Sequence, residues 1–500
     1  MGNEKKFELK NLIHKPTKEE IWRLVGALVS IYAAMRMILN LCYVSESLYQ
    51  TIRDGFLWKA MLYFMIIVLV ANKTKLINWQ TGVLAAICIP LIFLLPAKYK
   101  ESSPDLYNIY FPRYIVIALC LVLLLDIILY KKIVILKGRN LWFSILYVVC
   151  LLPAMILNKG GHYTILPFFP VFALLLIRLT KEEWIRVCFR VSIGYYLAFA
   201  YTMIKSFMTV PYTGERYYGI FINNGLFGIF AGGAFICALY WLVMEIRREK
   251  KRIPWIVLDS FAMAFALVCV DLISARVAML AVFVVAVAAF ILLAKKKKNL
   301  YTRLAITVGI LAVVAVLAII VILLLKDVSK DDIRTSISNT FVCEKVLYLH
   351  RIVQYLFRED SKHGVIQGGT LLNTIDWFSS GRISYWIAYM EDMNLWGHES
   401  MSLEASFRFL MHPHNTYISW LYQFGIIPGA LYIILFFVSV VVSVKGIIKG
   451  KSEYIFSFLW LAYCMLVYIN EVEQWGYQIG FLNLFVLYII AMNMNEKVKS

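Results

Sequence analysis

The stretch Leu304–Leu325 reads LAITVGILAVVAVLAIIVILLL and contains no charged residue and no proline. An α-helix rises about 1.5 Å per residue, so a run of this length crosses the hydrocarbon core of a bilayer, which is about 30 Å thick. Two further apolar blocks, at Ile115–Ile128 and Tyr432–Val444, reach a similar length with their neighbours. The sequence therefore predicts a protein that crosses a membrane several times.

The composition supports a membrane protein and excludes several other classes. The chain has 500 residues, of which 61% are hydrophobic and 16% are charged, whereas soluble proteins average about 45–50% and about 25%. Disordered chains, collagens and disulfide scaffolds are therefore excluded. The net charge of +19 is not a nucleic-acid signal, because Lys and Arg stand in short clusters between apolar runs.

Apolar runs of spanning length predict an all-α fold, a polytopic transmembrane bundle of about fourteen helices. The expected spans are roughly 21–44, 56–72, 77–96, 109–130, 141–157, 163–180, 184–208, 219–245, 254–272, 275–294, 302–325, 415–444, 454–470 and 476–494.

The distribution of Lys and Arg predicts the orientation of these spans. One set of alternate loops carries about thirty of the positive charges and the other set of short loops about eight. Cytoplasmic loops carry the excess of Lys and Arg, so both termini are expected in the cytoplasm. The polar start leads into a long first span without a small-residue cleavage site, which indicates an uncleaved signal anchor.

This topology divides the chain into five parts, one of which is an unusually long loop. The parts are a cytoplasmic tail at 1–20, a region of about 11 spans at 21–325, an extracytoplasmic loop at 326–413, a region of about three spans at 414–494, and a cytoplasmic tail at 495–500. Amphipathic pieces at Val346–Phe357 and Ile383–Met393 predict short helices in the loop. A loop of this length indicates a functional, partly helical lid before the span that starts near 415.

Several motifs of well-known chemistry are absent from the sequence. It contains no Walker loop, HExxH, GxSxG or paired CxxC, and no DxD on the predicted outer face. We therefore expect no metal and no cofactor. The cysteines fall mostly within apolar runs, which is typical of small buried hydrophobes. Gly228 and Gly232 form a GxxxG, which indicates helix packing.

The long loop closes with His412-Pro413-His414-Asn415, immediately before a predicted span. Histidine is the side chain whose ordinary pKa suits proton transfer near neutral pH. A single histidine at a membrane boundary is usually a solvated or hydrogen-bonded side chain. Two of them at i and i+2 beside Asn415 favour a functional role, with either His412 or His414 as the proton acceptor.

Three arginines are expected on the same outer face as the histidine pair. Arg276 lies between two spans, Arg382 lies in the long loop, and Arg216 precedes the span that begins near 219. A guanidinium group at a membrane boundary either snorkels to water or binds an anion, and an ion pair between Glu215 and Arg216 is an alternative for Arg216. Several cations facing a histidine cluster suit a polyanionic leaving group such as a diphosphate.

Four motifs together resemble the O-antigen ligase/polymerase family of bacterial membrane glycosyltransferases. In the family's order they are Arg-x-x-Gly-x-Phe-x-Asn-Asn from Arg216 to Asn224, Ser274-x-Arg276, Gly381-Arg382-x-x-x-Trp386 and His412-x-His414-Asn415. The family usually continues Gly-x-x-Gly, whereas this chain reads Gly425-Ile-Ile-Pro-Gly429, with the second glycine displaced by one. The resemblance covers roughly residues 180–495.

This resemblance implies a metal-independent, inverting glycosyltransferase of the bacterial cytoplasmic (inner) membrane. The donor would be a glycan on undecaprenyl diphosphate, and the acceptor a sugar hydroxyl on a polysaccharide or an anchor. The catalytic residues would be His414, His412 and Asn415, and the residues that bind the lipid diphosphate would be Arg276, Arg216 and Arg382. Membrane lipid and envelope polysaccharide assembly proteins are the expected partners.

Three functions remain open at this point. A polymerase and a ligase of this family differ in their acceptor, which one sequence does not reveal. A flippase or transporter of lipid-linked oligosaccharides would also suit about fourteen spans, but it would carry charges along a central cavity, with short loops. A scaffold of an envelope assembly complex would need neither the histidines nor the arginines.

Overall fold

The structure, a computed structural model, describes residues 17–41, 149, 181–209, 217, 219, 221, 224–248, 252–273, 275–294, 309, 312–313, 316–317, 382–398, 402–405, 408–410 and 412–469. Apart from Val149, the spans predicted between 56 and 180 lie outside the described residues, as do the span at 476–494, the short helix at Val346–Phe357 and nearly all of the run 302–325.

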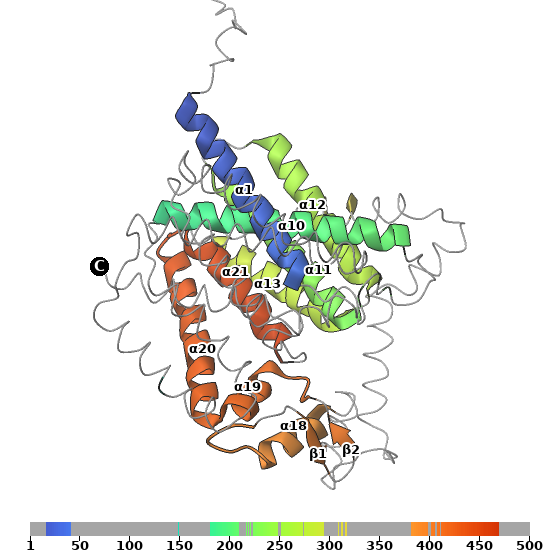
Figure 1. Ribbon diagram of the computed structural model, residues 1–500. Coiled ribbons are helices and arrows are strands. Elements are labelled where there is room, and N and C mark those ends of the chain that lie inside the picture. The colour runs from blue at the N-terminus through green and yellow to red at the C-terminus, as the bar shows by residue number, and fades with distance from the viewer. Residues whose placement is uncertain are drawn as a thin grey trace, which may run out of the picture.

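The described part consists of helices and one small hairpin (Figure 1). The helices are α1 (Lys18–Leu41), α10 (Lys181–Thr209), α11 (Asn224–Arg247), α12 (Ile253–Leu272), α13 (Arg276–Ala294), α18 (Arg382–Glu391), α19 (Thr416–Phe424), α20 (Ile426–Ile448) and α21 (Tyr454–Val467). The strands are β1 (Leu403–Ala405) and β2 (Arg408–Leu410), which pair antiparallel.

Local sequence explains where several helices begin. At α1, the Thr17 amide donates to the Glu20 carboxylate (2.7 Å) and the Glu20 amide donates to the Thr17 hydroxyl (3.3 Å), which is a capping box. Pro254 lies in the first turn of α12, where a backbone N–H would have no partner within the helix, so its missing N–H costs no hydrogen bond.

Among the described residues, four helices are long and apolar enough to cross a membrane: Trp184–Ser206, Phe227–Arg247, Ile253–Leu272 and Ile426–Ile448. The predicted all-α, membrane-type character is therefore confirmed for this part of the chain. Two predicted spans agree closely with observed helices, 254–272 with α12 and 275–294 with α13.

The single span predicted at 415–444 is wrong. The chain forms two helices there, α19 and α20, separated by Gly425, whose φ of 94° lies in the left-handed region. A residue with a side chain rarely adopts that conformation, so the helix cannot continue through it. The membrane candidate starts at Ile426 rather than near 415, and α19 belongs with the preceding loop.

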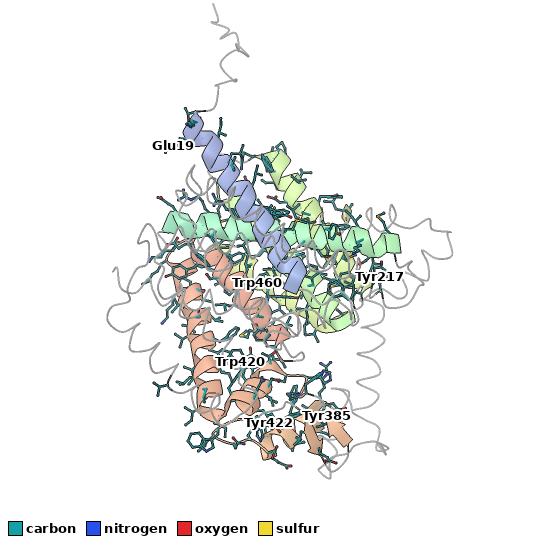
Figure 2. All side chains as sticks on the ribbon, viewed as in Figure 1. Glu19, Tyr217, Tyr385, Trp420, Tyr422 and Trp460 are labelled. Atoms are coloured by element: carbon teal, nitrogen blue, oxygen red, sulfur yellow. The ribbon has the colours of Figure 1, made fainter. Side chains whose placement is uncertain are left out.

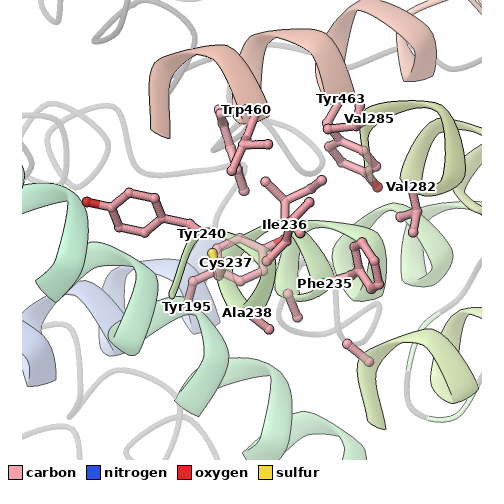
Figure 3. Packing of buried hydrophobic residues seen from close by; sticks show 14 of the residues in the cluster. Tyr195, Phe235, Ile236, Cys237, Ala238, Tyr240, Val282, Val285, Trp460 and Tyr463 are labelled. Carbon is pink, nitrogen blue, oxygen red and sulfur yellow. The ribbon is translucent and has the colours of Figure 1, made fainter. Parts of the chain in front are cut away.

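Helix α11 forms the centre of the bundle and packs against α10, α12, α13 and α21. From α21, Trp460 and Tyr463 reach toward α11 (Figure 3), and the Tyr463 hydroxyl donates to the Ile229 carbonyl (2.7 Å). A Cβ at Gly232 would overlap that hydroxyl, and a Cβ at Gly228 would overlap Ala275. The predicted packing role of this GxxxG is confirmed.

The described cysteines lie in the same core. Cys188, Cys237, Cys269 and Cys464 are free and buried. This confirms, for these four, the expectation that they act as small apolar side chains.

Three segments that the charge distribution predicts on one side of the membrane lie in contact at one end of the bundle. The Trp184 indole N–H donates to the Glu453 carbonyl (3.1 Å), and the Lys181 ammonium lies 3.1 Å from the Glu453 carboxylate. A guanidinium N–H of Arg247 donates to the Gly450 carbonyl (3.2 Å). The start of α10, the end of α11 and the α20–α21 turn therefore meet, as the alternation of charges predicts for these loops.

The described part of the long loop forms a small subdomain at the opposite end of α20, where α18, α19 and the hairpin lie together (Figure 1). Its core consists of Tyr389, Leu410, Ile418 and Tyr422. The helix predicted at Ile383–Met393 is confirmed as α18. The hairpin was not predicted, because its strands have only three residues each and show too short a pattern to recognise.

Candidate active site

The two histidines of the motif face each other between β2 and α19. Their ring centroids are 4.1 Å apart, and the ring planes meet at 66°. Both side chains are half-buried, in a segment that lies outside the candidate membrane spans. Two imidazole rings therefore stand in direct contact where the chain enters α19.

His414 has a φ of 51°, the only positive φ among the described residues other than glycine. Histidine tolerates this conformation better than most residues, but it still costs about 1–3 kcal/mol. The left-handed residue turns the chain from the hairpin into α19 and so fixes the direction of the ring. Backbone strain at a residue whose side chain can transfer protons indicates a functional segment.

Asn415 uses its side chain to build the start of α19. Its Oδ1 accepts from the Ile418 amide (3.1 Å), and its Nδ2 donates to the Ile469 carbonyl (3.0 Å). The side chain is 6% exposed. Asn415 is therefore an N-cap that also fastens α19 to the end of α21, and these contacts give it a positioning role beside the histidines.

Replacing Asn415 with Ala should destabilise the protein by about 1–3 kcal/mol, because the cap is lost and the Ile469 carbonyl is left without its donor. Asn415→Ser, which keeps a capping oxygen, should recover part of the loss. The midpoint of thermal unfolding in detergent measures both. Unchanged stability with abolished activity would contradict the positioning role and favour direct catalysis by Asn415.

Arg382 is the cation that the structure brings to the histidine pair. It is the first residue of α18 and is half-buried. Burial, and after it the positive charge of Arg382, lowers the pKa of His412 below its ordinary value of 6.5. His412 Nδ1 is buried and makes no hydrogen bond within the described part of the chain. A neutral imidazole beside a guanidinium group is suited to accept a proton next to a bound anion.

Helix α18 presents one face to the histidine segment. The Trp386 indole N–H donates to the Pro413 carbonyl (2.9 Å), and the Tyr385 ring lies 6.3 Å from the His414 ring. Figure 2 shows Tyr385 in the same subdomain as Tyr422 of α19. Sequence reasoning did not single out Tyr385, although its position three residues after Arg382 places both on one helix face.

Trp386→Phe should lower the turnover of substrate about 10- to 100-fold, because the hydrogen bond that holds the His412–His414 segment is lost while the ring packing is kept. The KM for the lipid donor that the sequence resemblance implies should change little. The check is a measurement of kcat and KM in vesicles, with Trp255→Phe at the far end of α12 as the matched control. An unchanged kcat would contradict the positioning role.

Backbone contacts link the histidine segment to α11. The Thr416 amide donates to the Tyr468 carbonyl (2.9 Å), just beyond the end of α21. About 7.5 Å earlier along α21, the Tyr463 hydroxyl meets the Ile229 carbonyl near the start of α11. The start of α19 and the start of α11 therefore share one end of the bundle.

The same end holds the turn between α12 and α13. Gly228 of α11 lies against Ala275, and Arg276 follows as the first residue of α13. The Tyr217 amide donates to the Leu272 carbonyl (3.1 Å), which ties the segment before α11 to this turn. These segments, far apart in sequence, are joined by direct contacts.

The predicted site residues are thus placed as follows. His412, His414, Asn415 and Arg382 lie together, and Arg276 begins a helix at the same end of the bundle. Arg216 lies outside the described residues, next to Tyr217. Within the residues described, no group of three or more His, Cys, Asp or Glu side chains could hold a metal ion.

Comparison with known proteins assigns no family: no family model matches the chain, and no curated protein matches it.

Proposed function

We propose that this protein is a membrane glycosyltransferase of cell-surface polysaccharide assembly, acting at the outer face of the bacterial cytoplasmic membrane. It transfers a glycan from an undecaprenyl-diphosphate-type donor to an acceptor hydroxyl. The observation that carries the proposal is the His412–His414 pair, in ring contact beside Arg382 and held by Asn415 at the end of a membrane-type bundle. A base beside a cation is what activation of a hydroxyl and departure of a diphosphate require.

In the proposed step, His414 removes the proton from the acceptor hydroxyl as its oxygen attacks the anomeric carbon of the donor. A new glycosidic bond forms, and the bond from that carbon to the diphosphate oxygen breaks with inversion. The diphosphate leaves with the bonding electron pair and remains on its lipid, and the proton stays on the imidazole. His412 is the second candidate for the base.

The arginines bind the diphosphate and stabilise the charge that develops on it. The proposed set is Arg382, whose charge acts on His412, together with Arg276 and Arg216. Guanidinium groups form bidentate hydrogen bonds with phosphate oxygens. The leaving lipid diphosphate carries the driving force, so the reaction needs no cytosolic energy source.

We expect the pH dependence of transfer to respond to the charge of Arg382. A neutral base is required, so with His412, the second candidate, as the base, activity falls as pH drops through the pKa of His412. Arg382 lowers the pKa of His412, and removing that charge in Arg382→Gln should raise it. The acidic limb of the rate profile should therefore move to higher pH, with Glu404→Gln on the hairpin as the control. An unmoved limb would contradict coupling between Arg382 and the base.

Lipid analysis of a deletion strain tests the proposed function. Loss of a polymerase should leave single repeat units on their lipid outside the membrane, and loss of a ligase should leave finished polymer on its lipid carrier. Units trapped inside would instead indicate a flippase, and normal lipid intermediates would indicate a non-catalytic scaffold. Either of the last two results would overturn the proposal.

A further inference from the structure

Helix α20 has an exposed apolar face that runs the length of a membrane span. Only 31% of the most apolar stretch of α20 is buried inside the protein, whereas 89% of the corresponding stretch of α11 is buried. The exposed large apolar side chains recur at spacings of about three, four or seven residues, which places them on one side of a helix. They are Ile426, Ile427, Ile434, Phe437, Val438, Val441 and Ile448. This stripe is an apolar surface that the described part of the chain leaves uncovered.

The first residue of α20 is bonded to the turn Asn394–His398, which follows α18. The Ile426 amide, at the first residue of α20, donates to the Asn394 carbonyl (3.1 Å). Leu395 and Trp396, the next two residues of the turn, are 50% and 52% exposed. Two large apolar side chains are thus about half exposed directly beside the end of a candidate membrane span.

Contacts with α19 and within the turn fix the backbone that carries Leu395 and Trp396. Gly397 has a φ of 79°, and a Cβ at this position would overlap the Gln423 carbonyl. The His398 ring stacks on Tyr422 at 3.9 Å, and its Nδ1 lies 3.0 Å from the Tyr422 carbonyl, to which it donates. The Trp396 amide donates to the Asn394 side chain (2.8 Å). The base of the turn is therefore fixed to α19.

The polar groups of the turn face its base. The Tyr422 hydroxyl donates to the Asp392 carboxylate (2.8 Å), which also lies 3.4 Å from His398 Nε2. Residues 383–407 contain no Lys or Arg, so attraction to anionic lipid is not what this surface offers. It carries a Trp, a residue type enriched at membrane interfaces, with an apolar Leu beside it at the end of a candidate span.

We propose that the turn Asn394–His398 is an interfacial membrane anchor, with Leu395 and Trp396 inserted at the headgroup level beside the outer end of α20. The anchor fastens the histidine-bearing subdomain to the bilayer surface, because its base is bonded to α19. This inference concerns lipid contact alone, and it stands whether or not the protein transfers glycans.

Photocrosslinking of the full chain in vesicles tests the anchor. The photoreactive residue p-benzoylphenylalanine replaces Trp396 or, in a second variant, Leu395. Ile434, on the exposed stripe of α20, serves as the lipid-facing control, and Glu404, exposed on β1, serves as the water-facing control. The vesicles contain phosphatidylethanolamine and phosphatidylglycerol, and mass spectrometry identifies the adducts.

The expected result is a phospholipid adduct at 395 or 396 and at 434, and none at 404. The adduct should persist when salt is raised or phosphatidylglycerol is omitted, since the turn carries no cation. Labelling at 434 without lipid at 395 or 396 would overturn the anchor. A crosslink from 396 to a second protein in native membranes, in place of lipid, would also overturn it and would assign the turn to a protein partner.

Discussion

Replacing His414 with Asn should reduce glycan transfer by about 10²–10⁴-fold while leaving a folded, membrane-inserted protein, because a positioned general base contributes a factor of that size. Asn is the appropriate replacement because it tolerates the φ of 51° that His414 adopts, which Ala does poorly. His414→Ala should also abolish polymer growth, but part of its effect would come from backbone strain.

Chemical rescue separates the loss of a base from the loss of structure. His414→Gly accommodates the positive φ and leaves a space next to the His412 ring, which lies 4.1 Å away in the intact pair. Added imidazole should then restore part of the transfer rate in this variant, and not in Arg276→Lys. His412→Asn should lose less activity than His414→Asn if His414 is the base. Normal chain length from His414→Asn would contradict the general-base role.

Arg276→Lys should reduce transfer by about 10²–10³-fold, because the charge is kept while the planar fork that matches a diphosphate is lost. The estimate follows the effect of removing one donor that stabilises developing negative charge in other enzymes. The rate of transfer from a purified lipid diphosphate donor, measured in vesicles, tests this expectation. Weaker donor binding and slower turnover should both contribute.

Arg252→Lys provides the matched control at the other end of α12. Arg252 pairs with the Glu245 carboxylate (2.6 Å) and is largely exposed, and a lysine can keep that ion pair. Its activity should stay within about twofold of the original, since exposed ion pairs contribute little. Full activity of Arg276→Lys would contradict diphosphate binding and favour simple snorkelling of Arg276 to water.

The helices that the sequence predicted best are those bounded by charges. The span predicted at 254–272 matches α12 because Arg252 and the residues before it end the apolar run sharply. The break at Gly425 could not be predicted in the same way, since apolar residues continue on both sides of it. At the break, the Leu395 carbonyl from another part of the chain occupies the space that a Cβ at position 425 would need.

The candidate site was predictable in its residue types and only partly in its geometry. The i, i+2 spacing of His412 and His414 indicated a pair, but their ring contact depends on the positive φ of His414, which no residue pattern reveals. The proximity of Arg382 to His412 depends on α18 packing on α19. The role of Asn415 as an N-cap, by contrast, can be predicted from its position directly before an apolar helix.

The fold also explains how distant segments reach one end of the bundle. A backbone hydrogen bond of 2.9 Å links Thr416 to Tyr468. Gly228 has no side chain and Ala275 has a small one, so α11 can pack closely against the turn before α13. The alternation of charged loops predicted a shared face for these segments but not their contacts, because tertiary packing of apolar helices has no local signature.

The most direct test uses the purified chain in vesicles with a glycan on undecaprenyl diphosphate, in the presence of a metal chelator. The proposal predicts that a longer glycan appears together with free undecaprenyl diphosphate, one lipid released for each glycosidic bond formed, and that His414→Asn produces neither. Movement of the intact lipid-linked glycan across the bilayer, with no new glycosidic bond and no released lipid diphosphate, would contradict it.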